Sequence, residues 1–356
     1  MEHTLVLDQL THKNVHNQFK LNGYHLNYDD MCRVAYSFIK EGDEYEKHIG
    51  SFLLEWLDDD LYIEVETSGT TGTPKVIRLE KRAMIQSALA TGDFFGLEPG
   101  NKALLCLSAK YIAGKMMLVR ALILGLSLDI TTVDGNPLAY NEEKYDFAAM
   151  VPLQVENSLD KLKQIKKIII GGAPVSKSLV EKLKKKKINA FETYGMTETI
   201  THVAAKKVGE KAFKTLPNII ISKDERDCLV IQALKIVSQK IVTNDIVEII
   251  SENEFLWLGR FDSVINSGGV KLFPEQIEIK LQDVISERYF IASLPDEKLG
   301  QKVILVLEGV PKEIPSTVFE VLDKFEKPKE IYFVSQFIVT KTGKLNRLQT
   351  LDLIKQ

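Results

Sequence analysis

A run of glycine and small hydroxyl-bearing residues separates two strand-like stretches early in the chain: Thr67, Ser68, Gly69, Thr70, Thr71, Gly72, Thr73, Pro74 and Lys75. Glycines let a backbone approach an anion closely, while amides, hydroxyls and a lysine supply hydrogen bonds and positive charge. The spacing differs from that of a Walker A loop, G-x-x-x-x-G-K-[ST]. The run therefore predicts a phosphate-binding loop of another type, with a simple hairpin turn as the alternative.

Around this loop, strand-like and helix-like apolar patterns alternate. Strands are predicted at residues 61–66, 76–79, 103–107, 128–133, 146–151 and 167–170. Helices are predicted at residues 28–40, 82–95, 112–124 and 177–187. Alternation of this kind favours a mostly parallel sheet with covering helices.

The pattern changes after residue 226. Three short strands, at 228–232, 246–250 and 255–258, predict a small β subdomain. After a glycine-rich stretch, further elements predict a small α+β domain: helices at 274–281 and 317–325 and strands at 289–293, 303–307 and 331–334. We therefore expect a large α/β N-terminal domain over residues 1–261 and an α+β C-terminal domain over residues 262–356.

Composition excludes several classes of protein. The 46 Lys and Arg residues nearly balance the 49 Asp and Glu residues, so no basic field favours nucleic acid. Cys32, Cys106 and Cys228 are too scattered for a disulfide framework or a zinc site. No signal peptide or membrane-spanning stretch is apparent, so we expect a cytoplasmic protein without integral membrane association. Five of the six histidines precede residue 49 and are expected on the surface.

The run at 67–75 resembles the phosphate loop of the adenylate-forming superfamily, which includes acyl-CoA synthetases, luciferases and the adenylation domains of peptide synthetases. Further motifs follow in the superfamily's order: the adenine-side loop Gly171, Gly172, Ala173 and Pro174; the aromatic-Gly-x-Thr-Glu motif around Thr193, Tyr194, Gly195, Thr197 and Glu198; the hinge motif Gly259, Arg260, Phe261 and Asp262; and the C-terminal lysine motif at 341–344. The resemblance implies an enzyme that uses ATP and Mg²⁺ to convert a small carboxylic acid into an acyl-adenylate and then a CoA thioester.

Three residues are implied to act at the reacting phosphate. Lys344 would neutralise the charge that develops on the α-phosphate and the carboxylate, with Thr197 and Glu198 beside it. Glu198 would bind Mg²⁺, which takes few carboxylates and keeps waters and phosphates. The alternatives are a helix cap for Glu198 and a solvated loop position for Lys344.

Three more residues are implied to bind the nucleotide. Tyr194 would stack on adenine, Asp245 would accept hydrogen bonds from the ribose hydroxyls, and Arg260 would contact ribose or phosphate. Core packing is the alternative for Tyr194, and a surface salt bridge is the alternative for Arg260. Asn244 directly precedes Asp245 and stands where the family commonly has glycine.

The resemblance also implies a second half-reaction. The C-terminal domain would rotate about Asp262 after adenylation and is therefore expected to be mobile. Gly268 and Gly269 would then line the route of the pantetheine arm of CoA, since glycines admit a thin chain closely.

The acid is suggested by a narrower resemblance. The phosphate loop begins earlier than in most of the family, so we expect a shortened N-terminal subdomain. Together with segments 111–117 and 194–202, this resembles the short bacterial o-succinylbenzoate–CoA ligases of menaquinone synthesis. The alternatives are an enzyme that loads another acid onto CoA or a carrier protein, and a non-catalytic nucleotide-binding protein.

Lys115 is the predicted contact for the acid. It shares the apolar face of the predicted helix 112–124 with Leu118, Val119 and Leu122, where an ammonium needs an anion or water. One explanation is that its side chain snorkels to solvent. The other is that it meets the second carboxylate of a dicarboxylic acid, with His202 in the same pocket.

Overall fold

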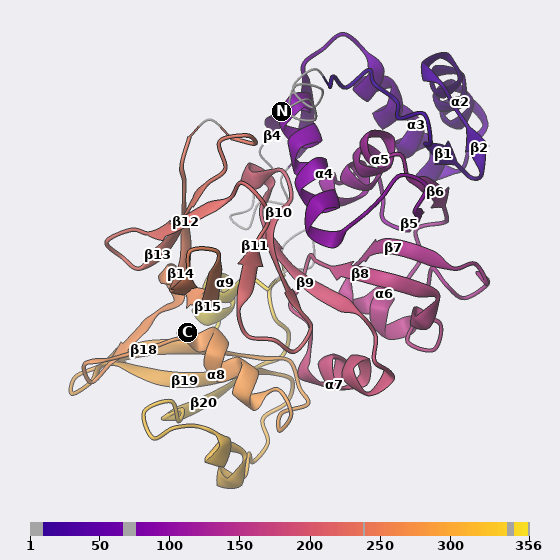
Figure 1. Cartoon of the computed structure of the whole chain (residues 1–356). Coiled ribbons are helices and arrows are strands. Elements are labelled where there is room, and N and C mark those ends of the chain that lie inside the picture. Colours follow the sequence, from indigo (N-terminus) through magenta and orange to yellow (C-terminus); the bar gives the residue numbers. More distant parts are fainter. Residues whose placement is uncertain (1–9, 67–75, 238, 340–344, 355–356) are drawn as a thin grey trace.

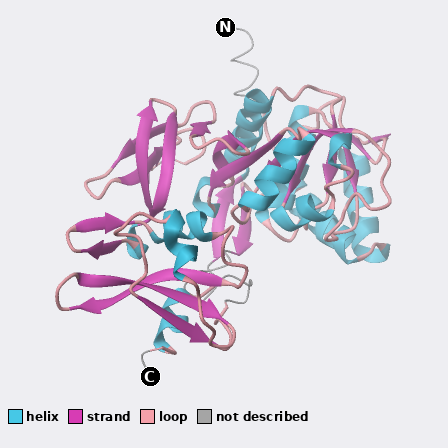
Figure 2. Cartoon of the chain, turned by 90° about the horizontal axis from the view of Figure 1, so that it is seen from below, coloured by secondary structure: helices cyan, strands magenta, loops and turns pink. Residues whose placement is uncertain are grey.

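The computed structural model describes residues 10–354 except 67–75, 238 and 340–344. Figure 1 shows helices α2 to α5 gathered beside the parallel strands, and a separate orange-to-yellow sheet formed by β18, β19 and β20. In Figure 2 the helices are concentrated on one side of the molecule, and the other side consists mainly of strands. The expected α/β fold with a smaller α+β part is confirmed.

The parallel half of the main sheet contains five consecutive neighbours. They are β6 (Ser127–Ile130), β5 (Lys102–Leu105), β7 (Tyr145–Met150), β8 (Ile165–Ile170) and β9 (Ala190–Gly195). Every pairing among them is parallel, so their carboxyl ends lie along one edge. A short hairpin, β1 (Lys20–Leu21) and β2 (Tyr24–His25), extends the sheet beyond β6. The predicted strands at 103–107, 128–133, 146–151 and 167–170 all belong to this half.

Helices cover both faces because the strands alternate apolar side chains between them. Ala103 and Leu105 of β5 belong to one buried cluster, and Leu104 and the adjacent Cys106 belong to another. Four helices contribute to the first cluster: α2 (Tyr28–Glu41), α3 (Glu44–Leu57), α4 (Lys81–Phe95) and α5 (Ile112–Leu124). Two contribute to the second: α6 (Pro152–Asn157) and α7 (Lys177–Lys186). Helix α3 was not predicted, whereas α5 has the predicted bounds.

The sheet continues without a break into an antiparallel half. Its strands are β10 (His202–Lys207), β11 (Phe213–Thr215), β15 (Glu254–Arg260), β14 (Ile241–Ser251), β13 (Cys228–Gln232) and β12 (Ile220–Lys223), in order across the sheet. The predicted small β subdomain therefore hydrogen-bonds to the parallel strands through the β9–β10 pair. In the described residues the sheet has 13 strands.

The last part of the chain forms a separate five-stranded sheet in the described residues. Its elements are β16 (Ile265–Ser267), β17 (Val270–Leu272), α8 (Pro274–Leu281), β18 (Tyr289–Asp296), β19 (Gly300–Glu308), β20 (Glu330–Val334) and α9 (Arg347–Asp352). The helix predicted at 317–325 is wrong, because the chain there forms the short 3₁₀ segment η4 (Ser316–Val321). This stretch is rich in β-branched and aromatic residues, which lose side-chain freedom in a helix.

The two sheets meet at η3 (Phe261–Ser263), next to the predicted domain boundary. Gln276 of α8 reaches back to the main sheet, where its Nε2 donates to the carbonyl oxygens of Trp257 and Leu258 at 3.2 and 2.9 Å. A second contact joins Lys177 at the start of α7 to Asp283, with 3.3 Å between Nζ and Oδ2. Division of the chain into domains at residues 261 and 262 remains a prediction. No helix in the described ranges is long and apolar enough to cross a bilayer.

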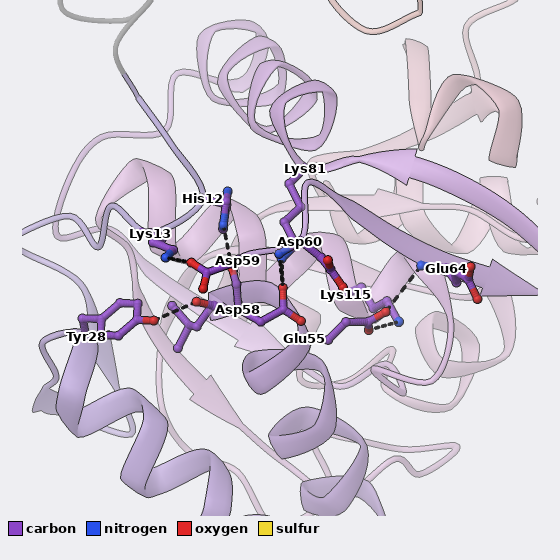
Figure 3. A network of polar contacts seen from close by, with 11 residues as sticks. His12, Lys13, Tyr28, Glu55, Asp58, Asp59, Asp60, Glu64, Lys81 and Lys115 are labelled. Atoms are coloured by element: carbon purple, nitrogen blue, oxygen red, sulfur yellow. Dashed lines mark hydrogen bonds and ion pairs between the residues drawn. The ribbon is translucent and has the colours of Figure 1, made fainter.

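A polar network closes the base of the hairpin formed by β3 (Tyr62–Glu66) and β4 (Val76–Glu80), the strands that flank residues 67–75 (Figure 3). The fully buried Lys81 donates from Nζ to Asp58 Oδ1 at 2.7 Å and from its backbone N–H to Leu61 O at 2.9 Å. His12 donates from Nε2 to the carbonyl oxygen of Asp58 at 2.9 Å and packs against Trp56. The expectation that the early histidines are surface residues is therefore wrong for His12, which is buried.

The buried ion pair predicts asymmetric losses of stability. Replacing Asp58 with Ala leaves the buried ammonium of Lys81 without its carboxylate, so the free energy of unfolding should fall by about 3–5 kcal/mol. Lys81→Met should lower it less, because it leaves only the partly exposed Asp58 carboxylate, which water can solvate. Urea unfolding of both variants measures the difference.

The neighbouring pair Lys13–Asp59 is the matched control, since both of its side chains are exposed. Lys13→Met should leave the unfolding midpoint within experimental error. Equal losses for Asp58→Ala and Lys81→Met would contradict this account of the network.

Candidate active site

Two predicted nucleotide motifs meet at the carboxyl edge of the parallel strands. The loop at 171–174 follows β8, and Thr193 to Gly195 end the neighbouring strand β9. Thr193 Oγ1 donates to Ile170 O at 3.0 Å, and a Cβ on Gly171 would lie only 3.0 Å from that hydroxyl. Gly172 has a φ of 85°, which favours glycine. This edge is where open α/β sheets bind their ligands.

Asp245 on β14 joins the same region from the antiparallel half. The Tyr194 hydroxyl donates to Asp245 Oδ2 at 2.6 Å, and Trp257 Nε1 donates to Oδ1 at 3.1 Å. Arg260, opposite Asp245 in the β14–β15 register, lies 3.8 Å from Oδ1. Burial and the Asp245 charge raise the pKa of Tyr194, so the phenol stays a donor. The structure thus places three predicted nucleotide residues together and adds Trp257, which the sequence analysis did not identify.

The substitution of glycine by Asn244 has a structural consequence. Asn244 Nδ2 donates to Asp262 Oδ2 at 3.2 Å, and Asn244 Oδ1 accepts from Arg226 Nη1 at 3.1 Å. The guanidinium of Arg226 lies 5.0 Å from the centre of the Phe261 ring. The predicted hinge residue Asp262 is therefore hydrogen-bonded, through Asn244, to β14, the strand that carries Asp245.

Glu198 lies exposed on the 3₁₀ segment η2 (Thr197–Thr199). Its carboxylate has no hydrogen-bond or ion-pair partner among the described residues, whereas Thr199 Oγ1 accepts the N–H of Met196. A capping role for Glu198 thus has no contact to support it, and the free carboxylate fits a Mg²⁺ ligand. The remaining predicted phosphate contacts lie outside the described residues: Thr67, Ser68, Gly69, Thr70, Thr71, Gly72, Lys75 and Lys344.

Gly195 is required by the close approach of β10. A Cβ at this position would lie 2.3 Å from Thr201 O and 2.5 Å from His202 Cα. Gly268 and Gly269 have a different reason, because they form the two-residue turn between β16 and β17 with φ values of 59° and 80°. Positive φ at both positions is typical of a tight hairpin. Contact of these two glycines with CoA remains a prediction.

Lys115 already has partners within the chain. Its Nζ lies 3.1 Å from Glu55 Oε2 and 5.1 Å from the centre of the Phe52 ring, and the residue is buried. Both partners come from α3, the helix that was not predicted. The ammonium is therefore held by an intramolecular carboxylate, which neither sequence-based explanation included. Its contact with the acid remains a prediction.

Arg120, five residues further along α5, has no such partner in the described residues. It is 1% exposed, and no carboxylate of the described residues pairs with it. Its Nε is buried without a hydrogen bond in the described part of the chain. There its only hydrogen-bond partners are Thr201 Oγ1 at 3.4 Å from Nη2 and Met117 Sδ at 3.7 Å from Nη1. Burial lowers the pKa of Arg120 to about 9. A buried cation without an anion is costly, which makes Arg120 a candidate binding residue.

His202 lies beside Arg120 and is also buried. Burial and the neighbouring guanidinium lower the pKa of His202 well below its ordinary value, so the ring is neutral. Its Nδ1 lies 3.3 Å from Thr201 Oγ1, and its Nε2 lies 3.4 Å from Thr91 Oγ1. The signal for Arg120 in the sequence was an arginine within the apolar helix 112–124.

Comparison with known proteins agrees with this geometry. Residues 10–220 match the family model described as AMP-binding enzyme. The structure of an acyl-CoA synthetase (AMP-forming)/AMP-acid ligase II-like protein from Dyadobacter fermentans is 37% identical, with a TM-score of 0.60, and the match covers 88% of this chain and 95% of that one.

Two further relatives carry the name of one substrate. The 2-succinylbenzoate–CoA ligase of Oceanobacillus iheyensis is 25% identical over 332 residues, or 81% of this chain and 69% of the relative. The o-succinylbenzoate CoA synthetase of Bacillus subtilis, solved with its acyl-adenylate intermediate, shares the fold at a TM-score of 0.75 with 16% identity, covering 97% of this chain and 96% of that one. The family resemblance seen in the motifs is confirmed: the chain belongs to the family of AMP-binding enzymes.

Proposed function

We propose that this enzyme is an AMP-forming acid–CoA ligase whose acid is o-succinylbenzoate, and that it acts in menaquinone biosynthesis. The acid and ATP would give acyl-AMP and pyrophosphate, and CoA would then displace AMP to form the thioester. The observation that carries the choice of acid is Arg120, a buried guanidinium that pairs with no carboxylate in the described ranges. The names of the 2-succinylbenzoate–CoA ligases among its relatives support the same acid.

Charge balance explains why a dicarboxylate suits this site. The carboxylate that attacks the α-phosphorus is consumed in the acyl-phosphate bond, so it cannot also neutralise a distant cation. A second carboxylate could supply the counterion that Arg120 lacks and hydrogen-bond its free Nε–H. Lys115 remains a predicted contact, but it would have to share its ammonium with Glu55.

The nucleotide residues are arranged for ATP. Asp245 presents two carboxylate oxygens, as recognition of vicinal ribose hydroxyls requires, and the Tyr194 and Trp257 donors orient them. Mg²⁺ would neutralise phosphate charge, and Glu198 is the exposed carboxylate that fits it. Arg260, about half exposed, can reach ribose or phosphate.

The second half-reaction would use the small domain. Rotation at Asp262 would exchange Lys344 for the turn at Gly268 and Gly269, which would meet the pantetheine arm. We also propose a cytoplasmic location, because all three cysteines are free thiols, as a reducing compartment favours.

The acid site predicts a difference between two cations on α5. Arg120→Gln should raise the KM for o-succinylbenzoate at least about tenfold, since a charge-assisted hydrogen bond is lost. The KM for ATP should change less than about twofold. The KM for a monocarboxylate analogue of the same skeleton should no longer be higher than the KM for o-succinylbenzoate. Pyrophosphate release with each acid measures these constants, and thioester formation with CoA reports the second step.

Lys115→Met, five residues before Arg120 on α5, is the matched variant. If Lys115 also binds the acid, the KM of this variant for o-succinylbenzoate rises. If the ammonium pairs with Glu55 alone, that KM stays unchanged. Wild-type KM in Arg120→Gln would remove the argument for the dicarboxylate. Acyl transfer to a carrier protein with little turnover of free CoA would instead favour a carrier-loading enzyme.

Glu198→Gln tests the metal site. The change keeps the size of the side chain and removes its charge, so adenylation should fall by about two orders of magnitude or more, and half-maximal activity should need more Mg²⁺. A Mg²⁺ titration of pyrophosphate release measures both effects. An unchanged titration curve would exclude Glu198 as a metal ligand.

Lys344→Ala separates the half-reactions. Adenylate formation should be lost, because charge at the α-phosphorus is no longer neutralised, while thioester formation from supplied acyl-adenylate should persist. The two steps are measured by pyrophosphate release and by thioester yield. Equal loss of both would contradict a lysine that serves one step only.

A further inference from the structure

The backbone turns sharply at Ile200, between Glu198 and His202. Ile200 has a φ of 66° and a ψ of −56°, and the N–H of Thr201 donates to Thr199 O at 2.7 Å. These values define a classic-type γ-turn, which is rare and strained. A β-branched residue with positive φ is a conformational outlier, and such residues cluster at functional sites.

The surrounding structure holds this turn in place. Ile200 is 2% exposed and packs in the large cluster formed by α2 to α5. The hydroxyl of the fully buried Thr199 accepts the N–H of Met196 and lies 2.9 and 2.8 Å from the carbonyl oxygens of Met196 and Thr201. The turn is therefore fixed from its own loop and from the core.

The turn places Thr201 at one end of a chain of hydrogen bonds with a single direction. Arg120 can only donate, so its Nη2–H donates to Thr201 Oγ1. The Thr201 hydroxyl then donates to Nδ1 of the neutral His202, whose Nε2–H donates to Thr91 Oγ1. Thr91 in turn donates to the carbonyl oxygen of Ser87 at 2.9 Å, which can only accept. Both ring nitrogens of His202 are thus occupied within the protein.

We propose that Ile200 and Thr201 are positioning residues for the acid site. The strained turn holds the Thr201 hydroxyl against Arg120, and the chain ending at Ser87 fixes that hydroxyl's direction. The hydroxyl thereby accepts one N–H of the guanidinium and fixes the plane of the group. The remaining N–H groups, including the Nε–H that has no partner among the described residues, can then face a carboxylate in that plane. His202 then supports the acid site through Arg120 rather than by its own contact. This inference rests on the proposed role of Arg120.

Four variants test the inference by kinetics. Thr201→Val removes the hydroxyl with little change of shape, and Thr201→Ser retains it. Ile200→Gly allows the turn to relax, and Ile200→Val retains a buried β-branched side chain. We expect Thr201→Val and Ile200→Gly to raise the KM for o-succinylbenzoate about tenfold and to change the KM for ATP less than about twofold. Thr201→Ser and Ile200→Val should retain most of the affinity for the acid.

A purely structural role would give a different result. Ile200→Gly would then lower the thermal midpoint, while the KM for the acid stayed at the wild-type value. The KM of Thr201→Val for the acid would also be unchanged. That outcome overturns the inference.

A second measurement does not depend on the acid. The Nε–H resonance of Arg120, assigned in ¹⁵N-arginine-labelled protein by its loss in Arg120→Lys, should shift in Thr201→Val and Ile200→Gly and stay near its wild-type position in Thr201→Ser and Ile200→Val. An unmoved resonance overturns the positioning role whatever the kinetics show. A shifted resonance together with an unchanged KM in Arg120→Gln would retain the positioning of the guanidinium and reject its role in binding the acid.

Discussion

The structure depends on one close approach, at the point where β9 gives way to β10. The backbone of Thr201 and His202 passes so near Gly195 that no side chain fits there. This approach lets an antiparallel strand join the edge of a parallel sheet, so the two halves become one surface. Tyr194 and Glu198 lie on either side of the junction, and Tyr194 reaches Asp245 across it. A larger residue at 195 would separate the groups that the site needs together.

Three cations are buried on α4 and α5, and the protein compensates their charge in two different ways. Lys81 pairs with Asp58, and Lys115 pairs with Glu55, so each buried ammonium has its own carboxylate. Arg120 has only a hydroxyl and a thioether as hydrogen-bond partners among the described residues. Since the first two show that this core supplies carboxylates where structure alone requires them, the third is better explained by a ligand.

Much of the fold follows from periodicity, and α5 is an example. Its apolar residues occur on nearly every face, which indicates a buried helix of the observed length. The partners of its charged residues could not be predicted, because Glu55 lies 60 residues away on a helix that the pattern did not reveal. Helix α3 contains a glycine, an aromatic pair and a histidine, and tertiary packing of Phe52 and Trp56 decides its conformation.

The same limit applies to the site. Tyr194 and Asp245 belong to recognisable motifs, but the contact of Asp245 with Trp257 depends on a register shift in the β14–β15 pair that no local pattern encodes. The positive φ of Ile200 could not be predicted for another reason. A β-branched residue predicts extended backbone, and only the packing around Ile200 imposes the positive φ. Lys115 drew attention in the sequence because a lysine in an apolar helix is conspicuous. Arg120 is the buried cation for which the described residues supply no carboxylate.

The contacts of β15 have a thermodynamic consequence. The side chain of Trp257 binds the Asp245 carboxylate, while its carbonyl oxygen accepts from Gln276 of α8. One residue thus reports on both the nucleotide pocket and the orientation of the C-terminal part. If a nucleotide displaces the indole N–H from Asp245, the contact between β15 and α8 would change as well. Reciprocity then requires that detachment of α8 change nucleotide affinity by the same factor. Nucleotide binding and the attachment of α8 would then be linked by one coupling free energy.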